Sequence, residues 1–465
     1  MTRREHLGLW TAVGLAALVA GAARIWVPAT SATDRHRGLA RWFTEGMRPL
    51  IGPADATGNP GHLMEWAIGG VVGRGTAAAV LTIALLAAVA AATYRLGARR
   101  LSGVWPALLT ALTMCASAVW VSESAVAGPV LVAIAATLWA QVVITSSRPT
   151  PWLVVGLLVG VALWATPAAL IIVAALLASA GPPRTRPDMT GAVLVTAGIA
   201  VGALPRILTS VGDGADGVGD LVQSIGWSAA RWESAADALW AAWVASDDSA
   251  QRWPLVAAVA AAVAVPALVM LWRRPSARDT MLVPLPVAVA VLVVCGPGTD
   301  TVACVAITAP SMAWWVTVAL SALPQRSRPT VSAAVLAGIA AVTAIGVATT
   351  EPVISNEDRA GLIALESSLV GLGAGAIRVE SPSAWTVIAT IDLPATSVRL
   401  DRPSLNDAPR RTAVIVDIAD GEATWATVLD ALTVTGGVDL VDSGRWRAAV
   451  ADSANVAALA FSTSD

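Results

Sequence analysis

The chain has 465 residues, of which 56% are hydrophobic and only 13% are charged. Its mean hydropathy of +0.69 lies far above that of a soluble globular domain, which excludes a wholly water-soluble protein. The formal net charge is −2, and apart from three histidines every basic side chain is arginine. We expect membrane lipid as a partner and no nucleic acid.

Apolar stretches long enough to cross about 30 Å of hydrocarbon recur along the first 350 residues. We predict eleven membrane spans, at approximately residues 7–27, 70–94, 104–122, 126–145, 152–165, 167–182, 190–207, 254–272, 280–296, 303–321 and 331–350. Short arginine-bearing segments recur with enough apolar sequence between them for the chain to cross the membrane and return. Because cytoplasmic loops are enriched in arginine, this pattern predicts a cytoplasmic N-terminus, and an odd span count then places the C-terminus outside.

Two of the predicted outer loops are long, at residues 28–68 and 208–253. Within the first, the segment from Arg35 to Met47 is able to form an amphipathic helix on the membrane surface. The spans and these loops together make a membrane domain over residues 1–350. The absence of lysine, together with an excess of alanine, glycine and valine, suggests a GC-rich bacterial genome. The predicted fold class is a polytopic α-helical membrane protein, expected in a bacterial inner (plasma) membrane.

The composition changes after Glu351, where charged residues return. Thr412 to Asp417 reads as a buried strand, Thr424 to Leu432 as a helix and Val438 to Val441 as a second strand. A segment of this size is large enough for its own hydrophobic core. We therefore predict an extracytoplasmic α/β domain over residues 351–465.

Asp34 is the first acidic residue after the first predicted span. A carboxylate placed a few residues beyond a span, facing the lipid surface, can act as a base toward a hydroxyl held there. The residues alone favour an ordinary role, because an aspartate in such a place commonly serves as a solvated loop residue or as a helix N-cap. The position of Asp34 is nevertheless the feature of the sequence that bears most directly on function.

Several short motifs follow one another along the membrane half. Arg24-Ile25-Trp26 ends the first span ahead of Asp34, Ser122-Glu123-Ser124 ends the third, and Thr166-Pro167 separates the fifth from the sixth. With these motifs the membrane half resembles the GT-C superfamily of glycosyltransferases, over residues 8–180 well and over residues up to 350 more weakly. Members of that superfamily use polyprenyl-phosphate-linked sugars at the outer membrane face.

The resemblance implies an inverting transfer of a sugar from a polyprenyl-phosphate donor to an envelope glycan, lipid or protein acceptor. Such a transfer needs a base for the acceptor hydroxyl, a cation for the leaving phosphate and a groove open to lipid. The implied catalytic residues are Asp34 and Glu123. The other candidates are donor-phosphate cations, Arg206, Arg24 and Arg35, and acceptor-binding residues, His62, Glu65 and Trp66. No cofactor is implied, and the three cysteines fit no metal-binding spacing. A divalent metal is compatible with such a reaction but is not indicated by the residues.

Alternatives to an enzyme stay open at this point. Arg35 stands where the superfamily has its second acidic residue, which favours a catalytically degenerate scaffold in an envelope-synthesis complex. Arg24 and Arg206 also fit a role in which they only reach the lipid headgroups, and Glu123 fits a solvated turn. A secondary transporter is the third alternative, opposed by the lack of a two-fold repeat in hydropathy and by scarce acidic residues within spans.

Overall fold

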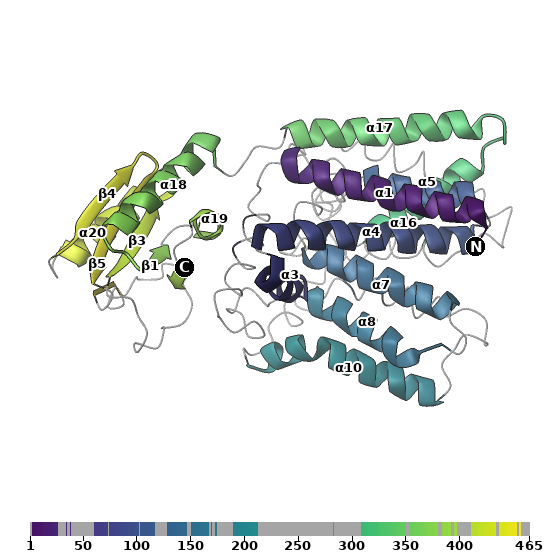
Figure 1. Cartoon of the computed structure of the whole chain (residues 1–465), viewed down its shortest axis with the longest axis horizontal. Coiled ribbons are helices and arrows are strands. Elements are labelled where there is room, and N and C mark those ends of the chain that lie inside the picture. The colour runs from purple at the N-terminus through teal and green to yellow at the C-terminus, as the bar shows by residue number, and fades with distance from the viewer. Residues whose placement is uncertain are drawn as a thin grey trace, which may run out of the picture. The chain divides into compact units, whose positions relative to one another are not determined.

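The computed structural model describes most of the helices and the C-terminal sheet. The described residues are 2–26, 34, 38, 60–72, 74–101, 103–116, 128–146, 150–166, 169, 173, 189–212, 282, 308–349, 354–379, 384–391, 395–397, 411–433, 437–452 and 455–456. They fall into two compact units, Met1–Pro28 with Gly58–Thr350, and Ala29–Thr57 with Glu351–Asp465. The first unit is helical and the second contains a β-sheet (Figure 1).

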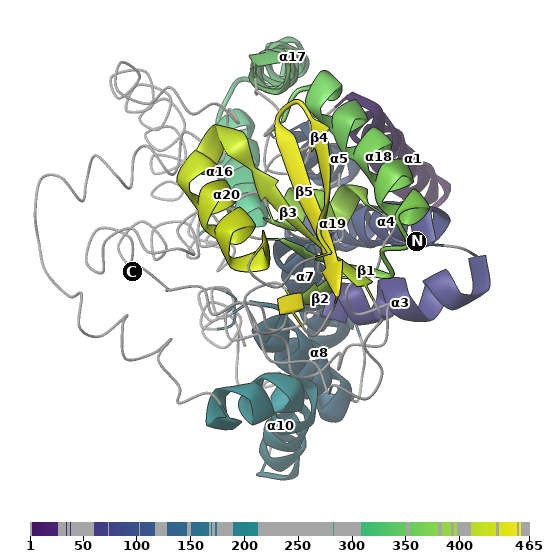
Figure 2. The same cartoon turned by 90° about the vertical axis from the view of Figure 1, so that its left-hand side faces the viewer.

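The helical unit is built from apolar helices that lie side by side, except that α3 runs across them (Figures 1 and 2). They are α1 (Arg3–Trp26), α3 (Pro60–Val72), α4 (Arg74–Arg100), α5 (Val104–Ala116), α7 (Pro129–Ser146), α8 (Trp152–Ala165), α10 (Met189–Gly212), α16 (Ala309–Ser321) and α17 (Arg328–Thr349). Eight of the predicted spans coincide with α1, α4, α5, α7, α8, α10, α16 and α17 over most of their length. The predicted span 254–272 and most of the predicted spans 167–182 and 280–296 lie outside the described residues.

Four helices of the described part are long and apolar enough to cross a membrane. The qualifying stretches are Arg3–Ala23, Thr76–Arg100, Met189–Ile207 and Arg328–Ile345. Val104–Ala116, Pro129–Thr145 and Trp152–Ala165 are shorter apolar helices. This is the architecture of a helical membrane protein, while the total of eleven spans stays a prediction.

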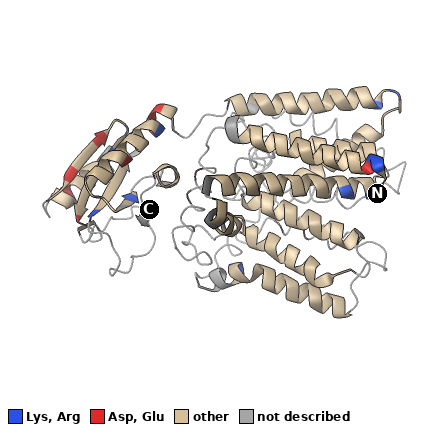
Figure 3. Cartoon of the chain, in the orientation of Figure 1, with Lys and Arg blue, Asp and Glu red and all other residues tan. Residues whose placement is uncertain are grey.

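The charged side chains of the helical unit lie near helix ends. Figure 3 shows long uncharged stretches between them. The start of α1 with Arg3, the end of α4 with Arg99 and the start of α17 with Arg328 lie at the same end of the unit (Figure 1). Arg99 Nη1 donates to Thr145 Oγ1 over 3.4 Å, which brings the end of α7 to that end as well. These arginine-bearing helix ends therefore lie together, while the orientation of the chain in the membrane stays a prediction.

Helices α8 and α10 pack together through facing glycines. Gly156 and Gly160 on α8 meet Gly198 and Gly202 on α10, with one glycine every four residues on each helix. A Cβ atom at Gly160 or at Gly198 would lie 2.6 Å from a carbonyl oxygen of the other helix. Small residues at this spacing let two backbones approach closely, which is a common way for helices to associate in lipid.

The second unit contains a mixed sheet of five strands. These are β1 (Ala376–Val379), β2 (Ala395–Ser397), β3 (Arg411–Asp417), β4 (Asp439–Ser443) and β5 (Trp446–Asp452), in the spatial order β2-β1-β3-β5-β4. β1 is parallel to β2 and β3, whereas β5 is antiparallel to β3 and β4. Its helices are α18 (Asn356–Gly371), α19 (Ala384–Thr390) and α20 (Ile418–Thr433), with α18 and α20 on opposite sides of the sheet (Figure 2).

Both faces of this sheet are buried, which explains the continuous apolar run of β3. Ala413 and Ile415 face a core that includes α18 and α19. Val414 and Val416 face the other core, against α20. A strand covered by helices on both sides is expected to be apolar at every position rather than at alternate ones.

Two boundaries differ from the sequence-based expectation. The predicted outer loop 28–68 contains the start of α3, whose several glycines conceal a helical pattern that begins with Pro60, a residue favoured in the first turn of helices. α20 begins at Ile418 rather than at Thr424, because Ile418 follows β3 directly without a loop. The predicted amphipathic helix from Arg35 to Met47 lies outside the described residues, apart from Gly38.

Candidate functional site

The structure places Asp34 in the same compact unit as the C-terminal sheet. Its side chain has no exposed surface and forms an ion pair with Arg359 in the first turn of α18. Arg359 Nη2 donates to Asp34 Oδ2 over 3.1 Å and to Oδ1 over 3.4 Å. The carboxylate singled out by the sequence is therefore held by a cation that lies 325 residues further along the chain.

Arg359 is itself fixed by a second contact. Its Nη1 donates to Thr390 Oγ1 over 3.2 Å, at the end of α19. The Thr390 hydroxyl donates in turn to the carbonyl oxygen of Thr386 over 2.7 Å. The guanidinium plane thus bridges Asp34 and Thr390, and its orientation is determined on two sides.

The start of α18 is fixed by a capping box. Ser355 Oγ accepts from the backbone N–H of Asp358 over 3.0 Å, and the Asp358 carboxylate accepts from the backbone N–H of Ser355. This arrangement satisfies backbone donors that the first turn of a helix leaves without intrahelical partners. Arg359 follows Asp358 directly, so the cap also sets the position of the arginine.

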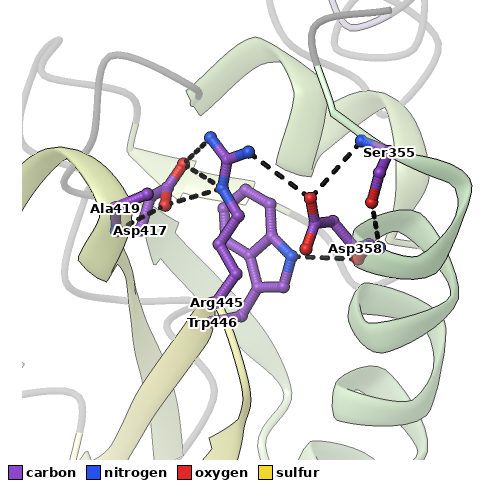
Figure 4. A network of polar contacts seen from close by, with 6 residues as sticks. All are labelled: Ser355, Asp358, Asp417, Ala419, Arg445 and Trp446. Atoms are coloured by element: carbon purple, nitrogen blue, oxygen red, sulfur yellow. Dashed lines mark hydrogen bonds and ion pairs between the residues drawn. The ribbon is translucent and has the colours of Figure 1, made fainter.

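A polar network ties this helix start to the sheet (Figure 4). Arg445 donates through Nε and Nη2 to the buried Asp417 at the end of β3, over 2.9 and 2.7 Å. Its Nη1 lies 3.5 Å from Asp358 Oδ2. Trp446 Nε1 donates to the backbone oxygen of Asp358 over 2.9 Å, and its ring lies beneath the Arg445 guanidinium. α18 is consequently anchored on β3 and β5 immediately beside the residue that holds Asp34.

The geometry leaves Asp34 with further hydrogen-bonding capacity. An ionised carboxylate has about four lone-pair directions, and the contacts from Arg359 use two of them. The shorter contact is to Oδ2, while the contact to Oδ1 is near the limit of a hydrogen bond. The pair can therefore orient a carboxylate that accepts a proton at Oδ1, and it can equally serve as a purely structural ion pair.

The remaining candidates lie on α1, α3 and α10 or outside the described residues. Arg24 lies in the last turn of α1 and the half-buried Arg206 near the end of α10, whereas His62, Glu65 and Trp66 lie on α3. Figure 1 shows the ends of α1 and α10, and α3, at the end of the helical unit opposite the arginine-rich one. Glu123 and Arg35 fall outside the described residues. Whether these residues and Asp34 share one cavity stays a prediction, since Asp34 belongs to the other unit.

Arg359 was not identified from the sequence. The capping pattern Ser355-x-x-Asp358 is a local signal for the start of α18, but no local signal connects Arg359 with a residue 325 positions away. Among the described residues, no three His, Cys, Asp or Glu side chains gather in a way that would hold a metal ion.

No protein-family model matches this chain, and no curated protein matches it in sequence. Among solved structures it is similar to ArnT from Cupriavidus metallidurans bound to undecaprenyl phosphate, with a TM-score of 0.59 and 14% sequence identity. That match covers 97% of this chain and 98% of the ArnT chain. The apo state of the same protein gives a TM-score of 0.55 at 15% identity, with the same coverage. At this identity the similarity shows that the chain has the fold of ArnT, in agreement with the fold that the resemblance to the GT-C superfamily implied.

Proposed function

We propose that the protein transfers a sugar from a polyprenyl-phosphate donor to an acceptor in the bacterial cell envelope, at the outer face of the plasma membrane. The observation that carries the proposal is the position of Asp34, a buried and oriented carboxylate eight residues after the end of α1 in a chain with the GT-C fold. The similar ArnT structure contains undecaprenyl phosphate, which supports a polyprenyl lipid as the donor carrier here.

The proposed reaction is a single inverting displacement. The acceptor hydroxyl oxygen attacks the anomeric carbon while the bond from that carbon to the phosphate oxygen breaks, and the bonding electrons leave with the polyprenyl phosphate. Asp34 takes the hydroxyl proton as the general base, with Glu123 in an assisting role. The products are the glycosylated acceptor and free polyprenyl phosphate. The acceptor is an envelope glycan, lipid or protein, and no cofactor takes part.

Arginines are proposed to bind the donor phosphate, since a guanidinium forms charge-assisted hydrogen bonds with phosphate oxygens. Arg206 is the first choice, because it lies near the end of α10, which the predicted topology assigns to the outer face. Arg24 and Arg35 are the further candidates, and His62, Glu65 and Trp66 are proposed to contact the acceptor. Substitution Arg206→Ala is expected to weaken binding of undecaprenyl phosphate, measured with the purified protein in nanodiscs.

The test of the catalytic role is the substitution Asp34→Asn, which preserves shape and removes basicity. Removing a positioned base costs on the order of 100- to 10,000-fold in rate. Asp34→Asn is therefore expected to abolish complementation of the envelope phenotype of a deletion strain, at an unchanged level of folded protein. Asp430→Asn, at an exposed position on α20, is the matched control and should complement fully. Full complementation by Asp34→Asn would refute the proposed enzymatic function.

A scaffold without catalytic activity is the second candidate, and one observation favours it. The Asp34 carboxylate is buried and paired with Arg359, as in an ion pair whose role is only to hold the segment around Asp34 on α18. The double variant Asp34→Asn/Arg359→Gln separates the two candidates, because two amides replace the ion pair by a neutral hydrogen bond. A scaffold would keep its function in this variant, whereas the enzyme would lose it.

A further inference from the structure

We propose that Arg359 is a positioning residue for the transfer reaction, so that the C-terminal α/β unit orients the carboxylate that activates the acceptor. The inference rests on the proposed function. Arg359 Nη2 lies 3.1 Å from Asp34 Oδ2, and the Asp34 side chain has no exposed surface. Asp34 is thus held by a side chain from a part of the sequence that follows the last predicted span.

The contacts of Arg359 fix the orientation of its guanidinium group as well as the position of its positive charge. Its guanidinium bonds Asp34 through one terminal nitrogen and Thr390 Oγ1 through the other, over 3.2 Å. The Thr390 hydroxyl donates to the carbonyl oxygen of Thr386, and its oxygen accepts from Arg359 Nη1. A planar guanidinium held through both terminal nitrogens has a defined orientation, which fixes the position of Nη2 beside the carboxylate.

The support behind Arg359 is rigid. Asp358, the preceding residue, is bound by the Ser355 cap, by Arg445 and by the indole N–H of Trp446. Trp446 is fully buried in the core beneath α18. Reacting groups need to be held within about 0.5 Å of their productive position, and side chains locked by such outer hydrogen bonds meet that requirement. The network of Figure 4 therefore supports Asp34 through Arg359.

If Arg359 positions Asp34 for the reaction, substitutions of Arg359 should change turnover per folded molecule, which a purely structural Asp34–Arg359 ion pair does not predict. The ammonium group of a lysine cannot form planar hydrogen bonds to Asp34 and Thr390 as a guanidinium does. Arg359→Lys therefore retains the positive charge beside Asp34 but no longer fixes the orientation of its carboxylate. A misplacement of about 1 Å costs on the order of 100-fold in rate. We expect Arg359→Gln to lower turnover per folded molecule about 100-fold and Arg359→Lys to restore part of it, with the KM for the donor unchanged within about twofold.

The experiment uses the full chain expressed in the deletion strain. Its membranes supply the acceptor, a panel of undecaprenyl-phosphate hexoses is added, and release of undecaprenyl phosphate is measured against the amount of folded protein. Arg447→Gln is the matched control, since Arg447 belongs to the same unit and pairs with Asp442 at an exposed position. It should behave as wild type. Complementation of the envelope phenotype by each variant is scored in parallel and decides the outcome if no hexose of the panel is transferred.

A second variant keeps the inference testable if Arg359→Gln does not fold. Thr390→Val removes the outer anchor of Arg359 at nearly constant volume and leaves the Asp34 pair in place, and we expect about a tenfold loss of turnover. If Arg359→Gln has wild-type turnover and Asp34→Asn has lost turnover, the positioning role of Arg359 is overturned and the proposed transferase function is retained. Full function of Asp34→Asn would instead overturn the proposed function, and the positioning role with it.

Discussion

At the scale of single residues, the C-terminal unit contains one ion pair whose loss should be costly. Asp417 is buried, accepts two short bonds from Arg445 and also accepts from the backbone N–H of Ala419 at the start of α20. Arg445 retains some solvent contact, with 22% of its side chain exposed. Removing one partner of a buried pair leaves a charge without compensation, which the partial exposure of Arg445 reduces but does not cancel.

We therefore expect Asp417→Ala to destabilise the unit by about 2 kcal/mol. The measurement is hydrogen exchange of the β3 and β5 amides in the full-length protein, which should become about 30-fold faster, since each 1.4 kcal/mol is a factor of ten. Asp442→Ala is the control, because the pair of Asp442 with Arg447 is exposed and should contribute less than about 1 kcal/mol. Equal exchange rates in the two variants would contradict the assignment of Asp417 to a buried, stabilising pair.

Among single residues, Asp34 could be predicted from the sequence but its partner Arg359 could not. The position of Asp34 after an apolar span was sufficient to single it out, because span ends and acidic residues are visible in the sequence. Its partner was not predicted, since an ion pair between positions 34 and 359 depends on the folded path of the chain. Arg359, Arg445 and Trp446 each look like ordinary surface or core residues when only their sequence neighbours are considered.

At the scale of secondary-structure elements, the pairing of α8 and α10 depends on the absence of side chains. A methyl group at Gly160 would meet Ile199 O at 2.6 Å and the Cα of Gly202 at 2.8 Å, and neither backbone atom can move independently. Gly338 in α17 offers a matched control, because a methyl group added there meets nothing within 4 Å.

We expect Gly160→Ala to destabilise the protein by about 1–3 kcal/mol, the usual cost of overpacking. Gly338→Ala should be neutral or slightly stabilising, since alanine is the better helix former. Thermal unfolding of both variants in the same detergent measures the difference. A Gly160→Ala melting temperature equal to that of wild type would mean that the two helices do not meet through their glycines.

Element types were easier to predict than element limits. Long apolar runs identified α1, α4, α10 and α17, because hydrophobic length alone indicates a membrane helix. The strand at β3 was predicted within one residue at its start, since Thr412–Asp417 is apolar on both faces. α3 was missed because its apolar length is too short for a span and its glycines lower helix propensity.

At the scale of the whole molecule, the GT-C fold was predicted from a few short motifs and is supported by the similarity to ArnT over nearly the full length of both chains. At 14% identity this similarity shows the fold alone, and the residues that carry the chemistry remain to be tested by substitution. Asp34 belongs to the same compact unit as the C-terminal sheet, although it lies in the predicted outer loop 28–68 of the membrane domain. The sequence gives no signal for this, since the segment lies between two predicted spans.

The orientation of the chain in the membrane is the last prediction. Arginine-bearing ends of α1, α4 and α17 gather at one end of the helical unit, and the positive-inside rule assigns that end to the cytoplasm. α17 then leads outward, so the C-terminal unit that follows it, with Arg359 and the Asp34 pair, should lie outside, where lipid-linked sugars are proposed to react.

A reporter that is active only in the cytoplasm should give no signal when fused after Asp465. The same reporter inserted between Ser321 and Arg328, next to the arginine-rich end, should be active and serves as the control for expression. Activity after Asp465 would require an even number of spans, place the Asp34–Arg359 pair in the cytoplasm and remove the physical basis of an outer-face transfer. A silent fusion after Asp465 with an active one in the α16–α17 connection would agree with the outward direction of α17 and with an acceptor reached from outside the cell.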